Sequence, residues 1–494
     1  MLGNPRVTTR IVTSGFRLPA AVAAVAIAFV GWAGATASAA AAPRAAVTCT
    51  DDWTGPASGT ANWDTSADWS AGVPNGSSVV CIKKAGTYTV EVTTPGAAAA
   101  AVVVGGAASG AQTLQIDGVN FPITQPSKVL KGGVLSLTPT SSSSAAISAT
   151  GTTISLTVEA GGMLSSAGTS NNAVIATPLL VNKGTVNLAA ASNQDNAGTT
   201  ADTGSFTIAS GSTLTSSNTD FTHSAGKLTV HGTFTAENTF TQSGGKETGN
   251  PVTLPNATLT DSAGTGSFIF TGTADVMTGT VPAGQTVTTR DNLQVGTSTT
   301  PVTVDGNLIC EPASTFSCDF STAGNDMWPG LAVASGGTVS TIGPGNPSDD
   351  VFANLDANMD VKAGGTLTIA NPATTVNAVT LRNSGTWQVT ATGNITIGGN
   401  CAVDSTGTTG VTVGSKITAP DGTIDTTNIS SFTATGTLAV HTAGSEAQAE
   451  VITTRSGLSA AFSKFSFGNH HYTVTYVKNT SGDVIGVEVT PATG

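Results

Sequence analysis

The chain has 494 residues, enough for several ordinary domains or for one long repeat array. Only 10% of the residues are charged and 59 are glycine, a composition that favours the array. The 30 acidic residues outnumber the 18 basic ones and give a net charge of −12. This balance argues against nucleic acid or an anionic membrane as the main partner, because both attract clustered Lys and Arg.

The first 39 residues have the pattern of a secretory signal peptide. A basic start with Arg6, Arg10 and Arg17 precedes an apolar core at 18–30 and the small-residue cleavage site Ala37-Ser38-Ala39. A membrane span needs about 20 apolar residues, and no later stretch is apolar for that long. We therefore expect cleavage after residue 39, a linker at 40–48, and an extracellular protein that is secreted or associated with the cell surface.

Cysteine usage fits an oxidising exterior. The order of the five cysteines predicts two disulfides, Cys49–Cys81 and Cys310–Cys318, and leaves Cys401 as a buried free thiol. The first bridge would stabilise the N-terminal module by roughly 3 to 4 kcal/mol.

Residues 49–95 form a denser module with three tryptophans, Trp53, Trp63 and Trp69. They stand in Trp53-Thr54-Gly55, Asn62-Trp63 and Trp69-Ser70-Ala71-Gly72-Val73-Pro74. This order resembles the N-terminal segment of secreted bacterial parallel β-helix proteins, including those with autotransporter-type β-strand repeats. Two interpretations are open: the rings cover the end of a solenoid, or they are exposed and stack on a glycan.

Residues 96–435 repeat one pattern, clearest in MDVKAGGTLTI at 359–369. Two short alternating runs flank Gly364 and Gly365, which predicts strand, tight turn, strand. Variants recur about every 20 to 30 residues, a period that suits a parallel β-solenoid better than propeller blades. Insertions at 310–330 and 343–358 break the rhythm, and such loops are where a site is expected. Thr-x-Thr pairs, as in TFTAENTFTQ at 233–242, line ice-binding solenoids when they share a register, but here we predict no shared register.

Residues 436–494 end in two alternating runs, Tyr472 to Tyr476 and Ile485 to Val489, joined by a polar turn at 479–483. This pattern predicts a β-hairpin and resembles the terminal segment of the same β-helix proteins. The resemblance implies an all-β fold. It would be a right-handed parallel β-helix of the pectin-lyase-like kind, with an aromatic N-terminal cap and a β-hairpin C-terminal cap.

The acids Asp349, Asp350, Asp356 and Asp360 form the best candidate for a calcium site, the one cofactor that the sequence suggests. Oxygen side chains at 356, 358 and 360 resemble the start of an EF-hand loop, but Val361 stands in place of its glycine and Leu367 in place of its glutamate. A solvated loop that leads into a strand is the alternative.

The expected function is a non-catalytic structural or adhesive rod that binds a polysaccharide or cell-wall glycan; the oligomeric state is open. The competing function is a polysaccharide lyase or glycoside hydrolase, with the four aspartates and Lys362 as its site. Asn218-Thr219-Asp220 and Asp349-Asp350 match part of a polygalacturonase pattern, but its G-H-G and R-I-K elements are absent. An enzyme should bring two acids and a base together in a groove, whereas a rod should show Thr, Ser and Asn ladders with scattered acids.

Overall fold

The computed structural model describes most of the chain from residue 48 onward. The described residues are 48–149, 151–297, 299–312, 318–322, 329–343, 353–371, 374–376, 380–390, 394–397, 402–405, 408–412, 416–419, 432–434, 437–441, 449–454, 462–466, 472–478, 480 and 484–491. The predicted signal peptide, Cys401, and parts of both insertions lie outside them. No helix among the described residues has the length and apolar character needed to cross a membrane.

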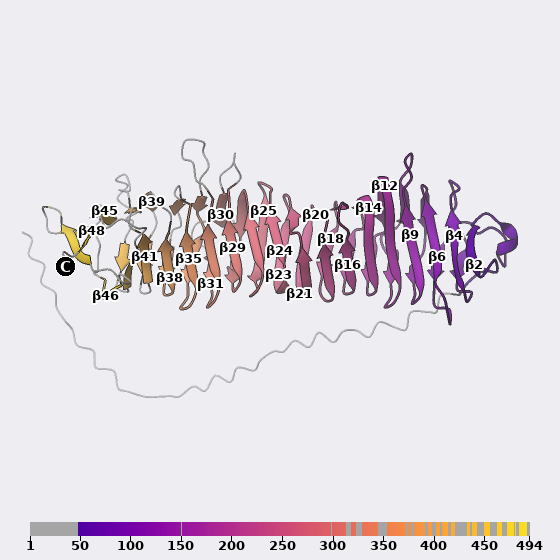
Figure 1. Ribbon diagram of the computed structural model, residues 1–494, viewed down its shortest axis with the longest axis horizontal. Coiled ribbons are helices and arrows are strands. Elements are labelled where there is room, and N and C mark those ends of the chain that lie inside the picture. Colours follow the sequence, from indigo (N-terminus) through magenta and orange to yellow (C-terminus); the bar gives the residue numbers. More distant parts are fainter. Residues whose placement is uncertain are drawn as a thin grey trace, which may run out of the picture. The chain divides into compact units, whose positions relative to one another are not determined.

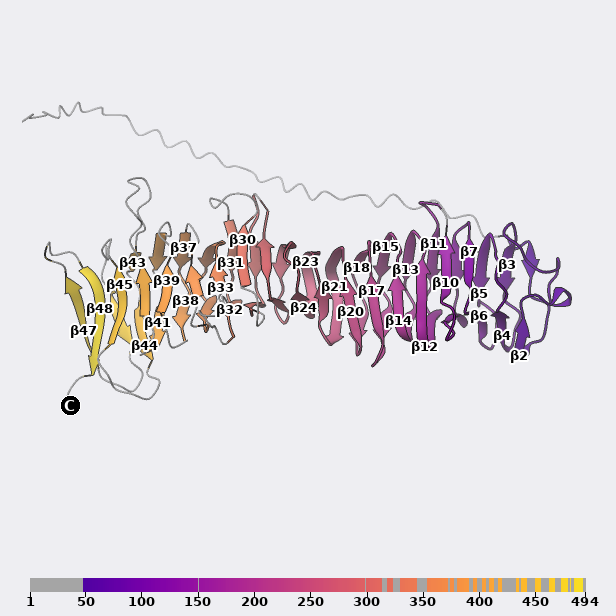
Figure 2. The same ribbon diagram turned by 90° about the horizontal axis from the view of Figure 1, so that it is seen from above.

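The described chain is a parallel β-solenoid, which confirms the predicted fold class. From β1 to β46 the strands pair in parallel with strands of a neighbouring turn, and one 3-10 turn (η1, Ser66–Asp68) interrupts the β structure near the start. Figures 1 and 2 show successive turns stacked in sequence order along the long axis of this unit. Within residues 96–435, side chains that hydrogen-bond across neighbouring turns are 18 to 33 residues apart in sequence, a range that contains the expected period.

Three runs of paired strands form three faces. Face A contains β1 (Asp51–Asp52), β3 (Val79–Ile82), β5 (Ala101–Val104), β8 (Ser127–Val129), β11 (Ser155–Val158), β13 (Leu179–Asn182), β15 (Thr199–Asp202), β18 (Asp220–His223), the first halves of β21 (Thr239–Gly249), β23 (Thr258–Thr265) and β25 (Asp275–Val281), then β27 (Asn292–Val295), β30 (Cys318–Thr322), β33 (Ala353–Leu355), β36 (Thr374–Val376), β39 (Asn394–Ile397), β42 (Lys416–Ala419) and β45 (Ala449–Thr454).

Face B follows face A in each turn. It contains β2 (Ser58–Asn62), β4 (Thr87–Val92), β6 (Gln112–Asp117), β9 (Gly133–Thr138), the first halves of β12 (Met163–Ala176) and β14 (Thr185–Asp195), β16 (Ser205–Ile208), β19 (Lys227–Val230), the second halves of β21 and β25, β28 (Val302–Val304), β31 (Pro329–Val333), β34 (Asn358–Val361), β37 (Thr380–Asn383), β40 (Ala402–Ser405) and β43 (Phe432–Ala434).

Face C completes the turn. It contains β7 (Asn120–Ile123), β10 (Ala145–Ala149), the second halves of β12 and β14, β17 (Thr213–Ser216), β20 (Thr233–Ala236), β22 (Val252–Leu254), β24 (Ser267–Phe270), β26 (Thr286–Thr289), β29 (Asn307–Cys310), β32 (Thr338–Thr341), β35 (Thr366–Ile369), β38 (Thr386–Val389), β41 (Thr408–Thr412), β44 (Thr437–His441) and β46 (Lys464–Ser466).

The core lies between the faces because alternate strand residues point inward. In β35, Leu367 and Ile369 are buried while Thr366 and Thr368 are partly exposed. The strand–turn–strand prediction for 359–369 is confirmed by β34 and β35, with Gly364 at φ +83° in the turn between them. Stacked phenylalanines continue the core along the axis; the ring centroids of Phe221 and Phe240, for example, are 5.3 Å apart.

The predicted hairpin cap closes the C-terminal end. Strands β47 (Tyr472–Lys478) and β48 (Val484–Pro491) pair antiparallel, and β48 pairs antiparallel with β45 of the last turn. The hairpin covers the edge of face A that parallel pairing would otherwise leave open.

Candidate functional site

The three tryptophans form the N-terminal cap. Trp69 lies edge-on to both Trp53 and Trp63, with ring centroids 4.9 Å apart in each pair, and its Nε1 donates to the Trp63 carbonyl at 2.7 Å. Trp63 also packs edge-on against Phe121 at 5.2 Å. None of the three rings is more than 4% exposed. Because no indole face is open to solvent, the capping interpretation is favoured over a glycan platform on Trp53, Trp63 and Trp69.

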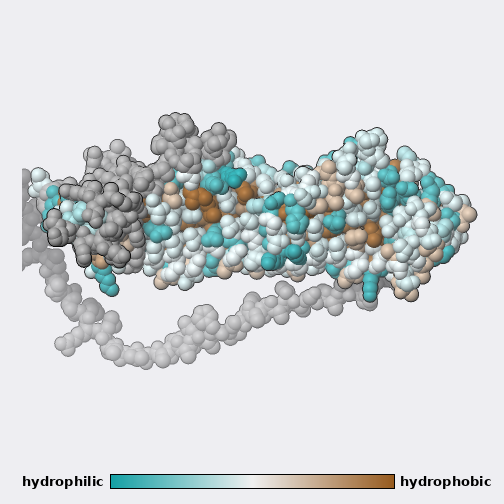
Figure 3. Space-filling view, viewed as in Figure 1, coloured by the Kyte–Doolittle hydropathy of each residue, from teal (hydrophilic) through white to brown (hydrophobic). Residues whose placement is uncertain are grey.

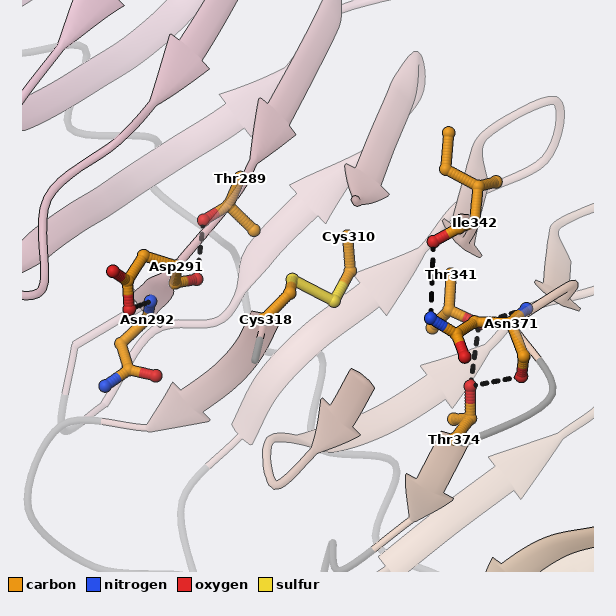
Figure 4. Close-up of a disulfide and its surroundings, with 9 residues drawn as sticks. All are labelled: Thr289, Asp291, Asn292, Cys310, Cys318, Thr341, Ile342, Asn371 and Thr374. Carbon is orange, nitrogen blue, oxygen red and sulfur yellow. Dashed lines mark hydrogen bonds between the residues drawn. A yellow bond between two sulfur atoms is a disulfide. The ribbon is translucent and has the colours of Figure 1, made fainter. Parts of the chain in front are cut away.

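Both predicted disulfides are present. Cys49–Cys81 joins positions 32 residues apart at the N-terminal end, and Cys310–Cys318 joins β29 to β30 inside the core. Figure 4 shows the second bridge beside Thr341, Asn371 and Thr374 of later turns, whose hydrogen bonds satisfy polar groups near the core. The one group of three potential metal ligands found among the described residues is Cys49, Asp52 and Cys81, and its two sulfurs are tied up in the disulfide.

The calcium candidates are only partly described. Asp349 and Asp350 lie outside the described residues, and Asp360 forms an ion pair with Lys362. Residues 358–361 are strand β34, paired with β31 on one side and β37 on the other, so no EF-hand-like loop exists there. Asp356, another of the candidates, acts on the nearby Asp319: burial, and then the charge of Asp356, raise the pKa of the Asp319 carboxyl to about 7. Calcium binding at this group stays a prediction.

A column of buried polar side chains runs along the end of face A. Val104, Val129 and Val158 hold this position in three successive turns. The next five turns place polar residues there, all 1% exposed or less: Asn182, Asp202, His223, Gln242 and Asp261. We call these five residues the corner column.

Hydrogen bonds link the first three members of the corner column. Asn182 Nδ2 donates to Asp202 Oδ1 at 2.7 Å, and His223 Nδ1 lies 2.8 Å from Asp202 Oδ2. His223 Nε2 has no hydrogen-bond partner among the described residues. The pair has the base and orienting carboxylate of a catalytic triad, but both side chains are fully buried in the described part of the solenoid.

The sequence carries a local signal for the corner column. Asn182 and Asp202 each stand two residues before a glycine, and their Oδ1 atoms accept from the Gly184 and Gly204 amides at 3.1 and 3.2 Å. These are Asx-type turns, in which a short polar side chain replaces a backbone acceptor. The N-x-G and D-x-G spacing at a strand end could have predicted them.

Face B is interrupted after β21, and the interruption forms a notch. Five residues lie between Lys246 and Val252 but only two between Thr265 and Phe268, although Lys246 pairs with Thr265 and Val252 pairs with Phe268. Among the described strands, Glu247, Thr248 and Gly249 pair with β19 but with nothing in the following turn. Face B resumes at Thr280↔Thr303. Figure 1 labels the strands involved, β21, β23, β24 and β25.

The notch is a pocket of about 240 Å³ lined by polar residues and glycines: Lys246, Glu247, Thr248, Gly249, Thr265, Gly266, Ser267 and Gly284. Glu247 ends an inward column that holds Phe206 and Leu228 in the two preceding turns. Its Oε2 accepts from the Ser267 amide at 2.6 Å, and its Oε1 has no hydrogen-bond partner among the described residues. Burial raises the pKa of Glu247 to about 7, against the lowering effect of the Ser267 amide.

Hydroxyl-bearing side chains share a register on face C, contrary to the prediction from spacing. Thr213 and Thr215 pair with Thr233 and Thr235 of the next turn. A longer outward column, which we call the polar column, runs through Ser267, Thr286, Asn307, Thr338, Thr366 and Thr386. Ile269 and Ile309 interrupt the neighbouring outward column, so the continuous Thr-x-Thr lattice of an ice-binding surface is absent here.

Glu247 is the one acid among the residues that line the notch, whereas most glycoside hydrolases place two carboxyl groups across the scissile bond. Figure 3 shows small, interspersed hydrophilic and hydrophobic areas on one side of the solenoid. The in-register hydroxyl and amide side chains of face C are the ladders expected of a rod.

Comparison with known proteins finds no family model, no curated protein and no solved structure that matches this chain. The parallel β-solenoid is thus established by its own strand pairing.

Proposed function

We propose that this protein is a secreted or cell-surface rod with a structural or adhesive role, which binds a polysaccharide along face C. The polar column carries the proposal. Six side chains, from Ser267 to Thr386, repeat in register at the strand spacing of about 4.8 Å. A row of hydroxyl and amide groups at a fixed interval suits a ligand that is itself a repeating, hydroxyl-rich polymer.

Three further observations support an extracellular rod. Two disulfides are compatible with an oxidising compartment. Both ends of the solenoid are capped, by buried tryptophans and by an antiparallel hairpin. Only 10% of the residues are charged, and outward positions of face C carry Ser, Thr and Asn in register. Detection of the protein in culture medium, with its N-terminus at residue 40, would test the location.

Binding of the purified protein to immobilised wall polysaccharides tests the function, alongside an ultraviolet assay for unsaturated uronates. We expect binding without uronate release. The double variant Thr338→Val with Thr366→Val should bind at least tenfold more weakly, because it removes two hydroxyls from the polar column at constant shape. The control variant, Thr241→Val with Thr260→Val, alters outward face A residues that pair across one turn and should bind normally. Release of uronates would overturn the proposal in favour of a lyase.

A further inference from the structure

The notch in face B and the polar column on face C meet at one residue. Ser267 lines the notch and is also the first member of the polar column. We infer that the notch binds one uncharged sugar unit of a polysaccharide whose chain continues along the polar column. This inference rests on the function proposed above and assigns its anchoring site.

The hydrogen-bonding capacity of the notch is built into the fold but unused within it. Glu247 is 4% exposed, and its Oε1 has no partner among the described residues. The buried hydroxyl of Thr248 lacks a hydrogen-bond partner as well. Glu247, Thr248 and Gly249 also present a strand edge with no described partner in the following turn. Buried polar groups without partners are costly, so a ligand that supplies hydroxyl groups to them gains binding energy.

Charge and size narrow the ligand to a neutral sugar ring. Lys246 and Glu247 both line the pocket, so a charged ligand of either sign would be attracted by one of them and repelled by the other. Burial raises the pKa of the Glu247 carboxyl to about 7, so above neutral pH the carboxylate offsets the charge of Lys246 and accepts hydrogen bonds from sugar hydroxyls. A pocket of about 240 Å³ lies below the roughly 300–1,000 Å³ that holds a drug-sized ligand. One ring therefore fits this volume better than an oligosaccharide does.

Gly266 makes the notch possible. A Cβ at this position would lie 2.8 Å from Glu247 Cβ and 2.9 Å from its Oε2. Any larger residue would push the carboxyl group from its place beneath the Ser267 amide. The glycine thus fixes the carboxyl position.

Calorimetric titration with neutral oligosaccharides of glucose, xylose, mannose and N-acetylglucosamine tests the assignment. Glu247→Leu is the main variant, because leucine already fills the same inward position at Leu228 in the preceding turn. It should keep or raise the unfolding midpoint while it weakens binding at least tenfold. Lys246→Ala should also weaken binding. Lys227→Ala, at the paired position one turn earlier and away from the notch, should leave binding unchanged.

The outcomes separate the two proposals. If the wild-type protein binds an oligosaccharide and Glu247→Leu binds it equally well, the notch is not the site, although glycan binding stands. If the wild-type protein binds none of the oligosaccharides and no wall polysaccharide, the proposed function fails and the notch assignment fails with it. Equal losses in Lys246→Ala and Lys227→Ala would also overturn the assignment, because a general charge effect would then explain both.

Discussion

Asp202 belongs to the corner column, in which polar side chains take the inward position that Val104, Val129 and Val158 hold in earlier turns. Asp202 is held by Asn182 and His223, all of them buried. Burying such a pair costs desolvation free energy that its mutual attraction only partly offsets. The polar residues of the corner column therefore fix the turn geometry through hydrogen bonds and add little net stability.

We expect His223→Leu to lower the free energy of unfolding by about 3–5 kcal/mol, because it leaves the Asp202 carboxylate buried with one partner fewer. Asp202→Asn combined with His223→Leu should recover most of this loss, because an uncharged amide at 202 does not need the histidine while its Oδ1 still accepts from Asn182 and from the Gly204 amide. Urea unfolding of the two single variants and the double variant gives the coupling energy. A double variant as unstable as His223→Leu would contradict this account.

The buried carboxyl groups predict an unusual dependence of stability on pH. Burial raises the pKa of Asp195 to about 6 and those of Glu247 and Asp261 to about 7, from ordinary values near 4. Between about pH 4 and pH 7 the folded protein then binds more protons than the unfolded chain. Its stability should therefore fall as the pH rises, by up to about 1.4 kcal/mol per pH unit for each such carboxyl.

Urea midpoints at pH 5, 6 and 7.5 measure this slope. The protein should be most stable at the lowest of the three values, and Glu247→Leu should reduce the slope because it removes one titrating group. Stability that rises from pH 5 to pH 7.5 would show that these carboxyl groups are ionised in the folded state.

At the scale of the element, turn glycines mark where buried side chains meet the next turn. Gly245 has φ +71°, and a Cβ there would lie 2.3 Å from His223 Nε2. Gly211 has a similar φ of +78° but open space around its Cβ position. A substitution at either position would therefore strain the backbone in the same way, but only at Gly245 would the new side chain also clash with His223.

We expect Gly211→Ala to cost about 1–2 kcal/mol, the cost of placing an L-residue in the left-handed region. Gly245→Ala should cost at least about 1–3 kcal/mol more, because the added methyl group displaces the imidazole from Asp202. Unfolding midpoints of the two variants under one condition give the difference. Equal costs would mean that His223 shifts freely, contrary to its close packing.

The sequence predicts strands better than it predicts what they build together. The alternation at 359–369 and at 472–489 gave β34, β35 and the C-terminal hairpin, because each strand's pattern is local. The notch and the polar column depend on register, and register depends on how many residues each turn contains. The unequal segments after Lys246 and Thr265 have no signature in either strand. Likewise, exposed and capping tryptophans look alike until the packing of Trp63 on Phe121 is seen.

At the scale of the whole molecule, a solenoid is stabilised by contacts between neighbouring turns, and its end turns lack one neighbour. At the N-terminal end the tryptophan cluster takes the place of the missing neighbour: Trp63 is 1% exposed and packs against Trp69 and Phe121. Without the cap, the first turn would present apolar side chains and an open strand edge, which can pair with a second molecule.

We therefore expect Trp63→Ala to cost about 3–5 kcal/mol and to cause concentration-dependent association through the exposed first turn. Trp387→Ala is the matched control, because Trp387 is equally buried but lies in β38, away from the N-terminal end. It should lose similar stability without associating. Sedimentation velocity at several concentrations distinguishes the two variants. Association of both to the same extent would mean that lost stability alone drives it, and the tryptophan cluster would then have no special role in keeping the rods apart.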